Sequence, residues 1–340
     1  MGFLHTLREE FRVKKFGLRF SSHRCFYRCQ WPIHPGIFLT YRVIVALYTL
    51  TWFLYTMLRS PFGGRGHFQL AYLTIWTYIA LVIHLIWAAN VAILCYCQSR
   101  TKQLSDGGKE DAIISRNDGQ KETYDNPAYQ TQEADDGAEP KGTPTLENGS
   151  NGSKELATDS TLPAVVITSP QSNTIEFTDT DTDLTRWFSK VSWVLFNILL
   201  AWAPIVTAIY YGALHKYILA YFDTLSYFPT SVYVTDLHLH GLNSLIVFIE
   251  IILAAFPIRI LHFIYPLTYG IVYVIWSVIY WSVDPQNNVL YPGILDWNTP
   301  GTTVLVMIGV LVVIFVLQFI WFLVHRIKMF IFKRYCSSPL

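Results

Sequence analysis

Charged residues are scarce in this chain of 340 residues. Asp, Glu, Lys and Arg make up only 14% of it, whereas 52% of its residues are hydrophobic. In an average soluble domain about a quarter of the residues are charged. The few charges nearly cancel to a net +1, which gives no reason to expect a nucleic-acid partner. This composition excludes an ordinary soluble domain and predicts an integral membrane protein in contact with membrane lipids.

We also expect no cleavable signal peptide, because the first thirty residues are basic and aromatic rather than apolar. Cysteines are few, and none lies in a segment that we expect outside the cytoplasm, which argues against a disulfide framework. Cytoplasmic cysteines beside a membrane are common acceptors of fatty acids, so all of them are candidates for lipidation. They are Cys25, Cys29, Cys95, Cys97 and Cys336. The neighbouring His23 and His34 do not have zinc-finger spacing, and we expect neither a metal nor a cofactor.

Six apolar runs are long enough to cross a bilayer. They cover residues 37–58, 69–97, 187–211, 236–256, 260–283 and 302–325. Short segments that are basic belong in the cytoplasm, which places both chain termini there. The expected outer loops are nearly free of Lys and Arg, except for Arg59 and Arg65 in the first; residues 212–235 form the second. We therefore predict an all-α protein, a six-helix transmembrane bundle, in the plasma membrane.

The chain divides into five parts. These are a basic amphipathic cytoplasmic N-terminus (1–36), helices one and two (37–97), an insert (98–184), helices three to six (185–328) and a cytoplasmic tail (329–340). Apolar residues alternate with basic ones in the first part, a pattern typical of a helix lying on an anionic leaflet. The alternative is a solvated basic tail. The first six residues also fit a myristoylation pattern at Gly2.

The insert has little apolar sequence and no hydrophobic periodicity, so we predict a disordered cytoplasmic loop between helices two and three. It contains an Asn-Pro-x-Tyr turn motif, which phosphotyrosine-binding-type and endocytic adaptors recognise. The motif residues are Asn126, Pro127 and Tyr129. We expect the insert to serve trafficking rather than activity.

The fourth apolar run carries a polar stripe. In a helix, His240, Asn243 and Glu250 fall on one face because they are three and seven residues apart. Such residues are costly in a membrane unless they face protein or a water-filled cavity, so they suggest a functional site. The alternative is that they form interhelical hydrogen bonds that only fix packing. The second run adds Thr74 near its outer end and His84 deeper in.

Several short motifs have an order and spacing that resemble the rolling stone family of multi-pass membrane proteins. The first five residues of each motif are Phe38-Leu-Thr-Tyr-Arg, Tyr72-Leu-Thr-Ile-Trp, His240-Gly-Leu-Asn-Ser, Phe263-Ile-Tyr-Pro-Leu and Tyr291-Pro-Gly-Ile-Leu. The resemblance covers everything except the insert and the extreme ends. That family is associated with myoblast fusion, so the resemblance implies a role in cell–cell fusion or adhesion.

More distantly, the chain is similar to the androgen-induced and androgen-dependent membrane proteins. These hydrolyse fatty acid esters of hydroxy fatty acids with a membrane-embedded Thr and His. Their His opens a helix and precedes a Glu by ten residues, as His240 precedes Glu250. Their Thr lies in a Phe-Leu-Thr-like triplet, which this chain offers at Thr40 and at Thr74.

The expected topology selects Thr74. Helices two and four both enter from outside, so Thr74 and His240 share a depth, whereas Thr40 would lie on the order of 20–25 Å away. A base must reach its nucleophile within hydrogen-bond distance. We therefore expect Thr74 and His240 to be a catalytic pair on one cavity near the outer surface, and the substrate-binding residues to be Asn243, Glu250 and His84. Asn243 is also a candidate oxyanion donor.

The sequence does not identify the residue that would orient the ring of His240. Asp236 is one turn before His240, where capping the helix is its commoner role. Asp284 or Asp296 of the last outer loop could fold back instead. Two hypotheses remain: a lipid-ester hydrolase that holds an acyl chain between its helices, and a non-enzymatic protein of cell–cell fusion or adhesion. A small transporter is less well supported, because paired broken helices are not evident.

Overall fold

The computed structural model describes residues 3–20, 24–58, 69–107, 183–224 and 230–336. Six helical segments in this part of the chain are long and apolar enough to cross a membrane, as the sequence predicts. Hydrocarbon offers no hydrogen bonds, so a spanning backbone must satisfy its own polar groups, as a helix does. The insert's motif residues and Gly2 lie outside the described residues.

The long helices are α3 (Pro35–Leu58), α5 (Leu73–Gly107), α7 (Asp183–Ile209), α11 (Ile264–Val283) and α12 (Pro300–Tyr335). The remaining span consists of α9 (Thr230–Asp236), a π-helical turn η4 (Leu237–Leu242) and α10 (Asn243–Leu253). A second π-helical turn, η3 (Tyr210–Leu214), joins α7 to α8 (His215–Thr224). The short elements are α1 (Phe3–Glu10), α2 (Arg24–Tyr27) and the 3-10 turns η1 (Val13–Phe16) and η5 (Ile260–Phe263).

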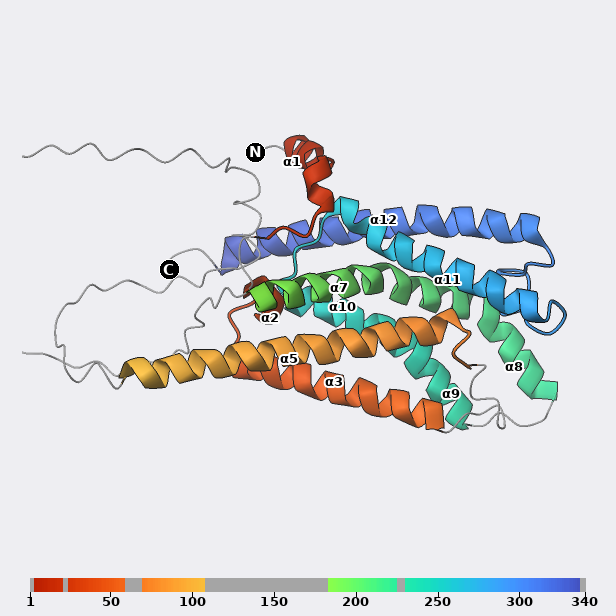
Figure 1. The fold of residues 1–340 in the computed structure, drawn as a ribbon, viewed down its shortest axis with the longest axis horizontal. Coiled ribbons are helices and arrows are strands. Elements are labelled where there is room, and N and C mark those ends of the chain that lie inside the picture. The colour runs from red at the N-terminus through yellow and green to blue at the C-terminus, as the bar shows by residue number, and fades with distance from the viewer. Residues whose placement is uncertain (1–2, 21–23, 59–68, 108–182, 225–229, 337–340) are drawn as a thin grey trace, which may run out of the picture.

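The long helices lie side by side and alternate in direction (Figure 1). The start of α3, the ends of α5 and α12 and the start of α7 lie at one end, which we call the terminal end because both chain termini are there. Helices α8 and α9 lie at the opposite end, together with the connection from α11 to α12; we call this the loop end. Because α5 and α7 both meet the terminal end, the two attachment points of the insert lie on the same side as the termini.

Helix α7 lies at the centre of the bundle and contacts α5, α10, α11 and α12. Its packing divides the core in two. One cluster joins α7 to α3, α5 and α10 around Leu81, Trp193 and Phe256, all at most 1% exposed. The other joins α7 to α11 and α12 around Trp202 and Tyr273 and extends toward the loop end.

Two boundary predictions were wrong. Residues 212–235 are not an outer loop throughout, because α7 continues through η3 into α8, and α9 begins again at Thr230. No proline lies between the start of η3 and the end of α8, and a π-helical turn accommodates one extra residue without ending the helix. The last helix also continues past 325 to Tyr335. Lys and Arg are good helix formers and are favourable near a helix C-terminus, so a basic run does not end a helix.

The N-terminal part is tied to the bundle. Arg259 donates hydrogen bonds from its two terminal nitrogens to the carbonyls of Gly17 (3.1 Å) and Arg19 (2.8 Å). Leu7 and Leu18 pack against the larger core cluster. The expected surface helix is therefore limited to the eight residues of α1. The apolar residues expected on one face of that helix lie partly in α1 and partly in the segment that follows it.

Candidate functional site

A cavity of 490 Å³ lies in the half of the bundle nearer the loop end, with walls from α7, α11 and α12. Most of its lining is Leu, Ile and Val. The polar groups on it are Thr74, Tyr210, His240, Tyr273 and Tyr291. No Asp, Glu, Lys or Arg of the described residues lines it. The cavity is thus suited to hydrocarbon with a small polar group at one place.

Thr74 is in the first turn of α5, and it is 9% exposed. The connection between α11 and α12 folds over this turn, because the backbone N–H of Leu73 donates to the hydroxyl of Tyr291 at 2.9 Å. Burial raises the pKa of Tyr291 to about 12, although hydrogen bonds from Tyr273, Leu73 and Thr74 oppose the shift. Tyr291 therefore keeps its phenolic proton at neutral pH, beside the Thr74 side chain.

His240 lies in the π-helical turn η4 and is also 9% exposed. Its ring is stacked on that of Tyr210, with centroids 3.7 Å apart and planes within 4°. The Thr207 hydroxyl bonds to the backbone carbonyl of His240 and lies 2.6 Å from the Ser244 hydroxyl. The Nδ1 atom of His240 is buried and has no hydrogen-bond partner in the part of the chain that the structure describes. Stacking, rather than a carboxylate, therefore fixes the orientation of this ring.

Asp236 stabilises the stacked rings of Tyr210 and His240 through a hydrogen bond with Tyr210. Its backbone is helical (φ −61°, ψ −42°) and continuous with η4, so it does not cap a helix. Its Oδ2 instead accepts a hydrogen bond of 2.6 Å from Tyr210, whose hydroxyl is also 3.3 Å from Nδ1 of His215. This chain of contacts holds the Tyr210 ring against His240.

The structure thus brings Thr74 and His240 to one cavity, although no hydrogen bond joins them in the described part of the chain. Thr40 is elsewhere, in the first turns of α3 at the terminal end, where its hydroxyl donates to the Gly36 carbonyl at 2.9 Å. Of the two threonines, Thr74 lines the cavity together with His240, and Thr40 does not. The catalytic role of the pair stays a prediction.

Comparison with known proteins gives the family. A family profile described as "Protein rolling stone" matches residues 168–338, half of the chain. The chain belongs to the rolling stone family. Protein rolling stone of Drosophila melanogaster is 29% identical over 143 residues, which cover 41% of this chain and 49% of that protein. The chain therefore spans about half the length of the curated relative it matches. No solved structure matches.

The rolling stone match covers α7 to α12 and so contains His240, Tyr210 and Tyr291. Every element of the cavity wall lies within it except the start of α5, which supplies Leu73 and Thr74. The family relationship therefore supports the architecture of the cavity, but it does not extend to the expected nucleophile.

The three residues expected to bind substrate do not line the cavity. Asn243 is fully buried, and its side chain has no hydrogen bond among the described residues. The buried His84 ring has its centroid 5.6 Å from that of Phe196 and 5.8 Å from that of Phe256. The expectation that Asn243 lies on the cavity wall was wrong, and Glu250, expected deeper on the same stripe, does not reach the cavity either. His240, Asn243 and Glu250 do share the buried face of this span. Glu250 is ten residues after His240, about 15 Å further along the helix, and so lies beyond the cavity.

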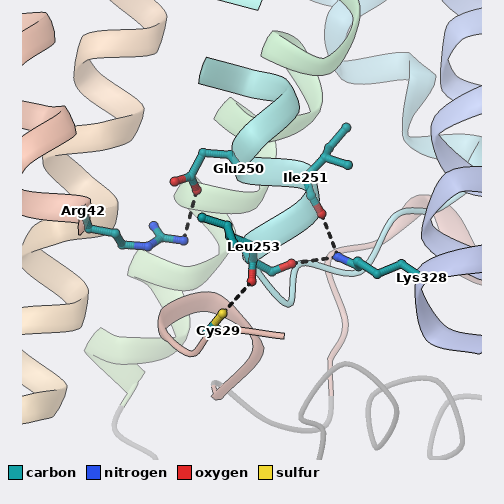
Figure 2. A network of polar contacts seen from close by, with 7 residues as sticks. Cys29, Arg42, Glu250, Ile251, Leu253 and Lys328 are labelled. Carbon is teal, nitrogen blue, oxygen red and sulfur yellow. Dashed lines mark hydrogen bonds and ion pairs between the residues drawn. The ribbon is translucent and has the colours of Figure 1, made fainter. Parts of the chain in front are cut away.

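Glu250 instead forms an ion pair with Arg42 of α3 at 3.1 Å, with both side chains 1% exposed (Figure 2). Lys328 of α12 donates hydrogen bonds of 2.8 Å to the carbonyls of Ile251 and Ala254 and so caps the last turn of α10. The roles of Arg42 and Lys328 were not predicted from the sequence. The position of Arg42 inside an apolar run could have indicated its role, because a buried arginine needs an anionic partner.

The cysteines that are candidates for lipidation differ in their solvent exposure. Cys25, Cys29 and Cys95 are buried, Cys97 is exposed and Cys336 is partly exposed. The Cys29 thiol donates to the Leu253 carbonyl at 3.2 Å, and burial raises its pKa. Acylation of a buried thiol would require this part of the fold to open, so Cys97 and Cys336 remain the better candidates. No group of three His, Cys, Asp or Glu side chains among the described residues could hold a metal ion.

Proposed function

We propose that this member of the rolling stone family hydrolyses lipid esters, with Thr74 as nucleophile and His240 as general base. The observation that carries the proposal is the shared cavity. A threonine hydroxyl and a histidine ring both lie on the wall of an uncharged space whose other lining is aliphatic and aromatic side chains. A hydroxyl needs a base to become nucleophilic, and a neutral imidazole can serve near neutral pH.

The reaction would proceed through an acyl-enzyme. The Thr74 hydroxyl attacks the ester carbonyl while His240 takes its proton, and the C–O bond to the alcohol breaks as His240 returns that proton to the leaving oxygen. Water then attacks the acyl carbon as His240 takes one of its protons, and the bond to the Thr74 oxygen breaks as His240 returns that proton to it, which releases the fatty acid. The neutral hydroxyl of Tyr291 lies beside Thr74 and is the best-placed donor for the oxyanion, a role that Asn243 cannot take from outside the cavity.

Fatty acid esters of hydroxy fatty acids are the substrate class implied by the distant similarity to the androgen-induced and androgen-dependent proteins. The test is hydrolysis of such an ester by purified protein. We expect Thr74→Ala and His240→Ala each to lower the rate by at least about a hundredfold, and the double variant to be no worse, because the two groups act as a unit. Activity in Thr74→Ala equal to that of the unaltered protein would refute the proposal.

Thr77→Ala is the matched control. Thr77 lies one turn further along α5, is fully buried, and donates its hydroxyl to the Leu73 carbonyl at 2.9 Å, but it does not line the cavity. It should retain activity, and so should Thr40→Ala.

The second candidate is a non-enzymatic role in cell–cell fusion or adhesion, which membership of the rolling stone family favours. In a cell-fusion assay this role predicts that Thr74→Ala behaves like the unaltered protein. The proposed setting is the plasma membrane, with both termini cytoplasmic and the adaptor motif at Asn126, Pro127 and Tyr129 on the cytoplasmic side.

A further inference from the structure

The two long walls of the cavity reach the outer surface of the bundle. On α11, Ile271 and Ile275 line the cavity and are 51% and 56% exposed. On α12, Ile308 and Leu311 line it and are 56% and 50% exposed. The outward surface of a spanning helix contacts hydrocarbon, so these side chains belong both to the cavity and to the lipid-facing surface. The cavity therefore opens sideways into the membrane, between α11 and α12.

The cavity has the depth of one leaflet. Its lining on α12 runs from Val304, one turn into the helix, to Ile314. Ten residues of helix rise about 15 Å, which is about half of a hydrocarbon core of about 30 Å. The lining on α11 runs from Leu267 to Ile275, about 12 Å of helix. The space is therefore parallel to the acyl chains of the leaflet at the loop end.

Its polarity is graded along that length. Thr74, His240 and Tyr291 lie toward the loop end, whereas the deep wall is formed by aliphatic side chains such as Leu267 and Ile314. A phosphate or carboxylate in this space would be a buried charge without a partner, because no cationic side chain of the described residues lines it. An uncharged ester carbonyl could instead accept a hydrogen bond near Thr74.

We propose that the cavity takes up one ester-linked acyl chain of a lipid directly from the leaflet at the loop end, sideways between α11 and α12. A charged group of the lipid, such as the carboxylate of a fatty acid ester of a hydroxy fatty acid, stays outside the cavity. The chain lies along the two helices, and the carbonyl reaches the level of Thr74. The ester as substrate rests on the proposed function, whereas the binding of an ester-linked acyl chain needs only the cavity.

The test is photo-crosslinking in phosphatidylcholine vesicles that contain the full-length protein. The probe is a neutral acyl ester with a diazirine in its acyl chain. We expect crosslinks in α11 and α12, and a several-fold lower yield when a Trp narrows the opening in Ile275→Trp or Ile308→Trp. The matched controls are Ile279→Trp and Val312→Trp. These positions are 54% and 53% exposed on the same two helices but do not line the cavity, so the yield should not change.

Three outcomes would overturn the inference. They are an equal loss of yield in the control variants, equal crosslinking by the free fatty acid of the same chain at neutral pH, and crosslinks that lie outside α11 and α12 in the unaltered protein. Thr74→Ala separates this inference from the proposed function. It should bind the probe normally and fail to hydrolyse it. If it binds and still hydrolyses, the catalytic proposal fails while the lipid site stands.

Discussion

Arg42 and Glu250 form an ion pair in which both side chains are 1% exposed, inside a membrane bundle. The Arg42 guanidinium also lies 4.8 Å from the centre of the Phe38 ring. Removing one member of such a pair leaves a buried charge without a counter-charge, which costs more than removing both. Replacing only one of the two residues should therefore destabilise the protein more than replacing both.

We predict that Glu250→Leu lowers the free energy of unfolding by about 3–5 kcal/mol, and that Arg42→Leu in the same chain restores part of the loss. Thermal unfolding in detergent measures both. The control is the pair of Arg12 and Glu9 near the N-terminus, in which the Arg12 side chain is 56% exposed, so that Glu9→Ala should cost at most about 1 kcal/mol. A double variant less stable than Glu250→Leu would show that Arg42 contributes through packing rather than charge.

At the scale of elements, the close approach of α11 to α7 shapes the cavity. Gly270 of α11 lies against Trp202 of α7, and a Cβ at this position would be 2.5 Å from the Trp202 ring. The indole N–H of Trp202 donates to the Pro266 carbonyl at 2.8 Å, so the ring cannot turn away without losing that bond. Both Gly270 and Trp202 line the cavity.

Gly270→Ala should therefore lower the thermal midpoint, since overpacking a core typically costs about 1–3 kcal/mol. Gly309→Ala is the control on α12, where nothing lies within 4 Å of the added Cβ. Alanine favours a helix over glycine, so that variant should be at least as stable as the unaltered protein. An unchanged midpoint in Gly270→Ala would mean that α11 can move away from α7 at little cost.

How far the sequence could predict this fold depends on the element. The six spans follow from apolar length, which is a property of each run by itself. The two π-helical turns do not, because an added residue in a helix is stabilised by its neighbours, such as the Thr207 contacts with His240 and Ser244. The same difference applies to the candidate site. Thr74 and His240 were expected at one depth, and both line one cavity. Asn243 and Glu250 share a buried face with His240, as the helical spacing predicts, but how much of that face lines a cavity depends on the neighbouring helices.

At the scale of the whole molecule, the arrangement fixes which parts share a side of the membrane. Both termini and both attachment points of the insert meet the terminal end, while the cavity opens in the half nearer the loop end (Figure 1). The charge bias predicts that the terminal end is cytoplasmic. The proposed lipid would then come from the outer leaflet.

Cysteine labelling on cells tests this orientation. We expect a membrane-impermeant maleimide to label Gln286→Cys, in the exposed connection between α11 and α12, on intact cells. Tyr335→Cys, 77% exposed at the end of α12, should react only after permeabilisation. Both changes belong in a background with Cys97 and Cys336 replaced by serine, because these native thiols are not fully buried. The opposite labelling pattern would place Thr74 and His240 on the cytoplasmic side, and the inner leaflet would then supply the lipid. It would also put the Asn148 and Asn151 sequons of the insert outside the cell, where glycosylation on either one would independently reveal it.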